Sequence, residues 1–242
     1  MLGSLHAGLG FAPAATFVPT DIAGCKLWLR GDLGVTTSGG NVIAIADQSG
    51  NGNNVVNSGT VAFNASAIGG LPGWTGDGNA WLENTAANLV SSGSGRTVFV
   101  VAKSAGAAGG GLLEFRTTTL PTNVMAHAVA GTGLLFYDSA HTWSDGANAS
   151  TSAIVYEGTW SSAVAPVMKT NGSPVTFATG SGNLDADSGG NGFCVMSWNR
   201  KQANIGWTGE MTEVVVYDSI LSAPNAAIVR SYLGSRYGIT VI

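Results

Sequence analysis

The sequence predicts an all-β protein in which short strands form a sandwich or barrel and a single helix lies near the C-terminus. Short apolar runs rich in Val, Ile and aromatic residues recur along the chain, and Gly-rich turns separate them. Only the stretch 222–237 shows the apolar spacing of an amphipathic helix. This combination argues against a βαβ fold, in which helices would alternate with strands.

The strands are expected in order along the chain. The first is Lys26 to Arg30, where one face belongs to the core and the other, with Trp28, is partly wet. Three hairpins are expected in the middle of the chain. They pair Arg96–Lys103 with Leu112–Arg116, Val124–Val129 with Leu134–Tyr137, and Ile154–Trp160 with Val164–Lys169. Asn171-Gly172 is the strongest signal for a two-residue hairpin turn.

The C-terminal end gives the clearest pattern. Three consecutive valines, Val214 to Val216, predict a strand that is covered on both faces. Ser222 is suited to cap the N-terminus of the following helix, with Pro224 in its first turn, and Gly238 is suited to end it. The apolar residues expected to pack on the sheet are Ile228, Val229, Tyr232 and Leu233.

Composition favours one domain, 21–242, preceded by an extended arm, 1–20. Charged residues make up 10% of the 242 residues, against about 25% in ordinary globular proteins. Hydrophobic residues reach 45%, so the chain is not disordered. The net charge is −4 and basic residues do not cluster, which argues against nucleic acid as a partner. No apolar run approaches the ~20 residues of a membrane span. Cys25 and Cys194 are expected to be buried free thiols rather than a disulfide.

Several stretches together resemble a known family. They are Leu27–Asp32 (LWLRGD), the polar turn Asp47–Asn53, the strand EVVVYDSILS beginning at Glu213, and the helix VRSYLGSRYGI beginning at Val229. In this order they resemble the opening strand, the following turn and the closing strand and helix of concanavalin A-like lectin/glucanase domains of the laminin-G type. The resemblance covers 21–242 and implies a two-sheet antiparallel jelly-roll sandwich. It does not imply an activity, because this fold hosts enzymes, lectins and adhesion modules.

No catalytic residue is predicted. Glucanases of this family carry an E-x-D-x-x-E pattern on one strand, whereas this chain has Glu210 and Glu213, whose spacing is expected to put them on opposite faces. The three histidines lack the companions of a zinc site, and no serine lies in a G-x-S-x-G turn. The chain is therefore expected not to be an enzyme.

Calcium is a candidate cofactor, because domains of this family often hold it at a loop rim. The candidate ligands are Asp47 and Asn51 in one Gly-rich loop and Asp185 and Asp187 in another. The alternative, which the residues favour, is that these side chains hydrogen-bond their own turns.

One aromatic and polar cluster is a candidate glycan-binding site. Its members are Tyr137, Asp138, His141, Trp143, Asp145 and Asn148. Aromatic platforms beside polar groups suit a sugar, although a Trp packed within a long loop fits the same residues equally well.

The apolar arm completes the functional hypothesis. It has no Lys or Arg, and its glycines interrupt the apolar core that a signal peptide requires. Its large apolar residues, expected to dock on a partner, are Leu2, Leu5, Leu9, Phe11 and Phe17. Such an opening resembles those of tailed-phage structural proteins. The sequence therefore favours a non-enzymatic structural or adhesion protein of a phage virion surface, of capsid-decoration or fibre type, bound to coat or tail proteins. A homo-oligomer, most plausibly a trimer, is expected. The alternative is a secreted bacterial carbohydrate-binding module whose partners are cell-surface glycans.

Overall fold

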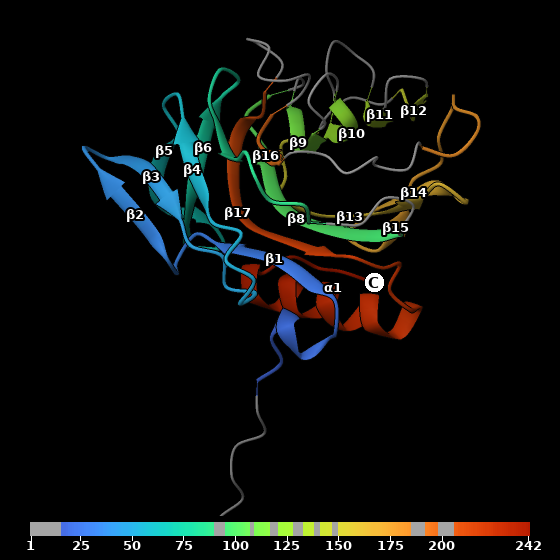
Figure 1. Ribbon diagram of the computed structural model, residues 1–242, viewed down its shortest axis with the longest axis horizontal. Coiled ribbons are helices and arrows are strands. Elements are labelled where there is room, and N and C mark those ends of the chain that lie inside the picture. Colours follow the sequence, from blue (N-terminus) through green and yellow to red (C-terminus); the bar gives the residue numbers. More distant parts are fainter. Residues whose placement is uncertain are drawn as a thin grey trace, which may run out of the picture.

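The computed structural model describes residues 16–89, 95–106, 109–116, 121–127, 133–137, 141–146, 150–184, 192–197 and 206–242. They form a β-sandwich with one α-helix packed beneath it (Figure 1), so the predicted all-β class is confirmed. The elements are η1 (Pro19–Asp21), β1 (Cys25–Arg30), β2 (Val35–Ser38), β3 (Asn41–Ile45), β4 (Val55–Ser58), β5 (Ala62–Ile68), β6 (Leu71–Asp77), β7 (Trp81–Asn84), β8 (Arg96–Ser104), β9 (Gly110–Arg116), β10 (Pro121–His127), β11 (Leu134–Tyr137), β12 (Thr142–Ser144), β13 (Ile154–Ser161), β14 (Val164–Thr170), β15 (Ser173–Pro174), β16 (Phe193–Val195), β17 (Thr208–Tyr217) and α1 (Ala223–Tyr237).

Two layers of antiparallel strands face each other. The layer beside the helix, called here the back sheet, has the order β1-β17-β8-β13-β14-β15. The opposite layer, called the front sheet, has the order β4-β7-β16-β9-β10-β11-β12. Strands β2, β3, β5 and β6 form the side that joins the layers (Figure 1), with β6 paired to the first half of β17.

β17 is buried on both of its faces, as its valine run predicts. Val214 and Val216 point into the core between the two sheets. Val215 and Tyr217 point the other way and pack with Val229 and Leu233 of α1. Successive side chains of a strand alternate between its faces, so an unbroken apolar run is required where both faces are dry. Trp28 of β1 lies on the helix side and is 5% exposed, so its expected partly wet position is wrong.

The helix begins and ends where the sequence predicts. Ser222 is the N-cap and its side chain accepts a hydrogen bond from the Asn225 N–H, while Gly238 ends the helix in the left-handed conformation with φ 66°. Val229 and Leu233 face the sheet as expected. Ile228 does not, because it lies on a neighbouring stripe of the helix and remains 45% exposed.

Two of the three predicted hairpins form, and one does not. β10 pairs with β11 and β13 pairs with β14, each antiparallel. The Asn171-Gly172 turn has φ 53° and 91° at its two residues and connects β14 to β15. β8 and β9 do not pair, because β8 lies between β13 and β17 in the back sheet and β9 lies in the front sheet. Apolar runs close in sequence can therefore lie in opposite layers of a sandwich.

Two glycines allow the strands to cross where the layers join. A Cβ on Gly31, just after β1, would lie 2.2 Å from the carbonyl oxygen of Pro72, and one on Gly73 would lie 2.5 Å from that of Met211. Because real Cβ atoms do not come so close to backbone oxygens, this corner requires residues without a side chain.

The remaining sequence predictions concern cysteines and membrane spans. Cys25 and Cys194 are both buried thiols, and neither forms a disulfide. Among the described residues, no helix has the length and apolar character needed to cross a membrane.

Candidate functional site

A row of directly paired residues crosses the outer face of the front sheet. Val56 of β4 pairs with Glu83, Glu83 with Cys194, and Cys194 with Glu114. The row continues from Glu114 through Val124 to Tyr137 and ends at Thr142. Directly opposite residues in antiparallel strands share one face, so the row forms a continuous stripe.

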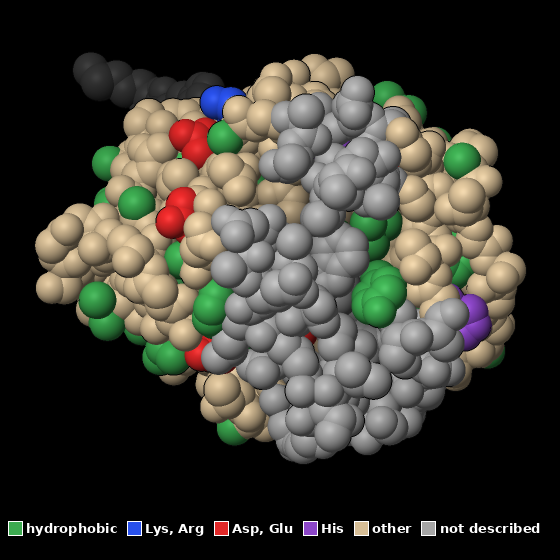
Figure 2. Space-filling model, turned by 90° about the horizontal axis from the view of Figure 1, so that it is seen from above, with side chains coloured by type: hydrophobic (Ala, Val, Ile, Leu, Met, Phe, Trp, Pro, Cys, Tyr) green, Lys and Arg blue, Asp and Glu red, His purple; other side chains and the backbone are tan. Residues whose placement is uncertain are grey.

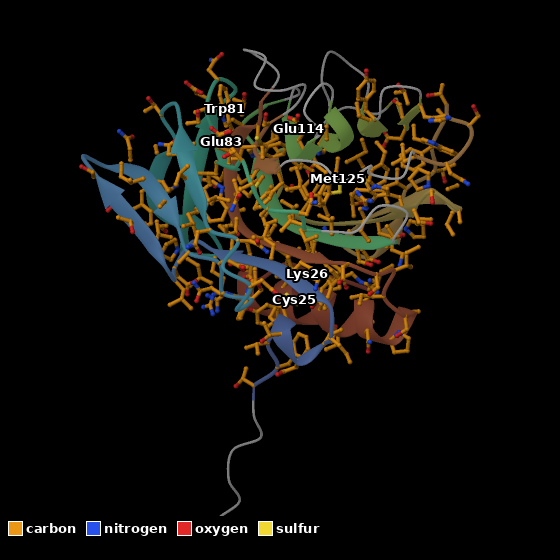
Figure 3. All side chains as sticks on the ribbon, in the orientation of Figure 1. Cys25, Lys26, Trp81, Glu83, Glu114 and Met125 are labelled. Atoms are coloured by element: carbon orange, nitrogen blue, oxygen red, sulfur yellow. The ribbon has the colours of Figure 1, made fainter. Side chains whose placement is uncertain are left out.

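Strand alternation shows which way this row points. The strand neighbours of its central members, Leu82, Val195 and Leu113, lie in the core between the sheets. Glu83, Cys194 and Glu114 therefore point away from that core. Figure 3 shows Glu83 and Glu114 in the upper layer of the molecule, on the side opposite to Cys25 and Lys26.

The side chains at the centre of the row are buried, whereas those at its ends reach solvent. Glu114 and Cys194 are 0% exposed and Glu83 is 8% exposed, whereas Val56 and Thr142 are exposed and Tyr137 is half-buried. The Ser197 hydroxyl donates to Oε2 of Glu114 at 3.1 Å. Figure 2 views the molecule from this side, where few charged side chains reach the described surface. A buried carboxylate requires hydrogen-bond donors, so this face brings polar groups to Glu114.

Another buried carboxylate, Glu213, lies on the opposite side of the molecule beneath α1. It accepts hydrogen bonds from Trp28 Nε1 at 2.6 Å, from Tyr237 at 2.7 Å and from Tyr232 at 3.1 Å. Nε of Arg236 lies 3.4 Å from its carboxylate. Burial raises the pKa of Glu213, and these donors and the guanidinium oppose the rise. This network joins β1, β17 and α1, and Glu213 itself is fully buried within it.

The expected separation of Glu210 and Glu213 onto opposite faces is wrong. A β-bulge between Met211 and Glu213 adds one residue to β17. Met211 and Val214 consequently both point into the core, and the two glutamates lie on the outer face. They still do not form a catalytic pair, since Glu210 bonds Asn64 and pairs with Lys103 at 3.5 Å while Glu213 is sealed under the helix.

The predicted glycan cluster divides between the two faces of the front sheet. Tyr137 belongs to the outer row, whereas Trp143 pairs with the core residue Phe136 and packs edge-on against Phe177 at 5.7 Å. Asp145 accepts a hydrogen bond from the Leu134 N–H at 2.8 Å, and half-buried His141 lies beside Gly182. Asp138 and Asn148 lie outside the described residues. Of the cluster, Tyr137 and His141 remain candidates for contact with a ligand.

The Asp47 loop is arranged as a turn rather than as a cation site. Oδ1 of Asp47 accepts from the N–H groups of Trp28 and Ser49, and Oδ2 accepts from the Ser49 hydroxyl and the Asn53 N–H, all within 3.0 Å. Asn51 directs its Nδ2 at the Cys25 carbonyl. Donors thus occupy the oxygens that calcium would need, so these residues do not fit the ion.

Other candidate ligands cannot be placed. Asp185 and Asp187 lie outside the described residues, and the described ones contain no group of three metal-ligating side chains. Of the arm residues, Leu2, Leu5, Leu9 and Phe11 also lie outside the described residues, whereas Phe17 packs edge-on against Tyr232 at 5.7 Å.

The front-sheet row was not predicted from the sequence, although one signal points to it. Glu114 interrupts an apolar strand, LLEFR, and Glu83 follows Trp81 and Leu82 in the same way. A single carboxylate at an alternating position of an apolar strand indicates a polar side chain held on the outer face. Sequence alone cannot align two such residues, because their alignment depends on β16, which comes from much later in the chain.

Comparison with known proteins agrees with this architecture. No protein-family model and no curated protein sequence matches the chain. Among solved structures, domain 4 of an extracellular arabinanase from Geobacillus stearothermophilus, in complex with arabinotriose, is similar with TM-score 0.58 and 13% identity over 84% of this chain and 96% of that domain. Trypanosoma rangeli sialidase has TM-score 0.60 and 15% identity, over 93% of this chain and 36% of that one. A structure of botulinum neurotoxin type C, whose cell entry depends on interaction with two ganglioside molecules, has TM-score 0.59 and 12% identity. The match covers 88% of this chain and 52% of that one. At these identities the similarity shows the fold, a lectin-like β-sandwich.

Proposed function

We propose that this chain is a non-enzymatic carbohydrate-binding protein whose ligand lies along the outer face of the front sheet, entering at Tyr137. The observation that carries the proposal is the single cross-strand row that holds Glu83, Glu114 and Tyr137. The half-buried ring of Tyr137 offers a sugar an apolar surface, and the buried carboxylates of Glu83 and Glu114 help to position the strands that present it. Paired residues of neighbouring strands are about 5 Å apart, so a ligand at Tyr137 also reaches the exposed Thr142.

The fold and the comparisons support this proposal at the level of architecture. The arabinanase domain is nearly the size of this chain and was solved with an arabinose trisaccharide. One sialidase structure is a complex with sialic acid, and cell entry of the neurotoxin depends on interaction with two ganglioside molecules; the matched part is 34% and 52% of those chains. An isolated domain of this architecture can therefore bind a glycan, and the row supplies suitable groups here.

The proposal excludes glycoside hydrolysis. That reaction needs two carboxylates on either side of the bond and a water molecule that reaches the anomeric carbon. Glu83 and Glu114 are 8% and 0% exposed, and Glu114 is hydrogen-bonded to Ser197. Their burial supports a positioning role for these carboxylates.

We expect a glycan panel containing arabino-oligosaccharides and sialylated glycans to identify a ligand, and titration calorimetry to measure its affinity. Tyr137→Ala should weaken binding at least tenfold, while Tyr137→Phe should retain most of it because the ring remains. Glu114→Gln should weaken binding, and Glu210→Gln on the opposite sheet should not. Circular dichroism would check that each variant is folded. Unchanged affinity in Tyr137→Ala, or release of reducing sugar from a bound glycan, would overturn the proposal.

We further propose that the protein is displayed on a phage virion; the alternative is that it is secreted. The charge-poor composition and the apolar arm 1–20 support anchoring to coat or tail proteins, in a homo-oligomer for which a trimer is the expected number. Intact mass and N-terminal sequencing of the protein from its native source distinguish the two locations. Retention of the arm on a purified particle supports the virion, and its removal from a protein found in the medium supports secretion.

A further inference from the structure

A small pocket lies on the side of the molecule where the two sheets join. The residues that line it include Asp32, Val35, Thr37, Phe63 and Pro72, none of which belongs to the front-sheet row. Its volume is about 240 Å³, below the roughly 300–1,000 Å³ of pockets that hold drug-sized ligands. The space therefore suits one small ring.

The walls of this pocket are two pairs of strands that are tied to each other. The β2–β3 hairpin forms one side, and the β5–β6 pair forms the other. The Phe63 N–H donates to the carbonyl of Gly40, in the turn of the hairpin, at 2.9 Å. The crossing of Gly31 and Pro72, which has no room for a Cβ, lies against the same pocket. The pocket is thus formed before a ligand arrives, which lowers the entropic cost of binding.

One wall of the pocket is aromatic and the other carries a hydroxyl group. Phe63 packs on the core but is only half-buried, so part of its ring remains available to the pocket. Val35 and Thr37 lie two residues apart on β2 and therefore share a face of that strand. Thr37 is exposed, and its hydroxyl can donate one hydrogen bond and accept others.

Asp32 adds a fixed acceptor to the pocket. Among the described residues that line the pocket, it is the charged one. Its Oδ1 accepts from Nε of Arg30 at 3.0 Å, and its Oδ2 accepts from Nη2 of Arg30 at 2.9 Å and from Nη2 of Arg236. Partial burial opposes ionisation, but the hydrogen bonds from Arg30 and Arg236 hold the pKa of Asp32 below its ordinary value.

The chemistry of this carboxylate limits the class of ligand. An ionised carboxylate has about four acceptor positions, so Oδ1 of Asp32 keeps one for another donor. Because two guanidinium groups already pair with the carboxylate, it suits a hydroxyl group better than a cation. Its own negative charge disfavours an acidic ligand.

We infer that this pocket binds one neutral sugar residue of a glycan, at a site separate from Tyr137. The apolar face of the sugar ring packs on Phe63, one hydroxyl donates to Asp32, and another bonds the hydroxyl of Thr37. The inference rests on the pocket alone and does not depend on the front-sheet row.

Filling the pocket tests the inference. The probes are the methyl glycosides of arabinose, galactose and glucose, with N-acetylneuraminic acid as the acidic counterpart, titrated while the amide chemical shifts of the protein are followed by NMR. We expect at least one neutral glycoside to bind, and Thr37→Phe to weaken its binding at least tenfold by occupying the space. Thr36→Phe is the matched control, because Thr36 is also exposed on β2 but lies on the other face of the strand. Its affinity should equal that of the parent.

The same spectra locate the bound sugar. We expect the largest shift changes at the amides of Thr37 and Phe63, and Asp32→Asn should weaken binding several-fold. Binding of none of the neutral glycosides, equal affinities in Thr37→Phe and Thr36→Phe, or tighter binding of N-acetylneuraminic acid would overturn the inference. Shift changes centred on Tyr137 would assign the sugar to the front-sheet row and would also overturn it, so the two sites can fail separately.

Discussion

Both sheets bury glutamates on their outer faces, and the sites of Glu213 and Glu114 differ in what surrounds the carboxylate. Under α1, Glu213 receives donors from β1 and from the helix, and Arg236 lies close by. On the front sheet, Glu114 lies in a row with Glu83 and Tyr137, and that row opens to solvent at its ends. Burial alone therefore does not distinguish a structural joint from a candidate binding site. The two kinds of site are distinguished by the elements that supply the hydrogen-bond donors.

Replacing Glu213 should have the largest effect on the stability of the protein. Glu213→Gln removes the charge beside Arg236 and substitutes an N–H group for one acceptor, so at least one buried donor loses its partner. We expect a loss of about 3 kcal/mol in the free energy of unfolding, measured by urea denaturation. Glu210→Gln, on the same strand, changes a half-buried carboxylate that pairs with the exposed Lys103 at 3.5 Å, and it should cost less than about 1 kcal/mol. Equal losses would contradict the structural role of Glu213.

The corner that joins the two sheets should be nearly as sensitive. Gly31→Ala places a Cβ 2.2 Å from the Pro72 carbonyl oxygen, so β1 or β6 must move. We expect about 2 kcal/mol of destabilisation. Gly106→Ala is the matched control, because its Cβ would meet nothing within 4 Å, and its effect should be close to zero. A stable Gly31→Ala variant would mean that the sheets do not depend on this crossing.

The pH dependence of stability provides a further test of the role of Glu213. Burial raises the pKa of Glu213 above its ordinary value of 4.5, so the folded protein holds this proton more tightly than the unfolded chain does. The stability contributed by the group is complete below that ordinary value and is lost as pH rises through the folded-state pKa. The slope is at most about 1.4 kcal/mol per pH unit for one group.

Denaturation of the parent and of Glu213→Gln between about pH 5 and pH 8 isolates this contribution, because other titrating groups are common to both proteins. The stability of the parent relative to Glu213→Gln should decrease as the pH rises through the folded-state pKa of Glu213. A constant difference would show that Glu213 does not titrate in this range.

The helix cap should give the smallest effect. Ser222→Ala removes the acceptor for the Asn225 N–H and should destabilise the protein by about 1 kcal/mol in thermal denaturation. Ser231→Ala, at an exposed position inside the same helix, should be neutral or slightly stabilising. Neither change should affect glycan binding, because the helix and the row lie on opposite sides of the sandwich.

The back sheet and its helix could largely be predicted from the sequence, and the front sheet could not. Local rules of strand alternation and helix capping predict the places of Val214–Val216, Ser222 and Gly238, and the structure agrees with them. The row through Glu83 and Glu114 depends on β16, a strand of three residues whose position follows from long-range pairing. The bulge in β17 and the wrongly predicted hairpin of β8 with β9 have the same origin, since both depend on which strands become neighbours in space.

The position of β17 also fixes an order of events during synthesis. This strand pairs with β1, β6 and β8, and the contact between Cys25 and Tyr217 closes a loop that includes most of the chain. Until Thr208–Tyr217 has left the ribosome, β8 lacks one of its two neighbours and the core lacks a central wall. The nascent chain therefore exposes its apolar strands until β17 emerges, and closing such long loops makes folding slow. A domain of this topology therefore completes its folding only after β17 has emerged, and chaperones that shield the apolar strands until then would assist it.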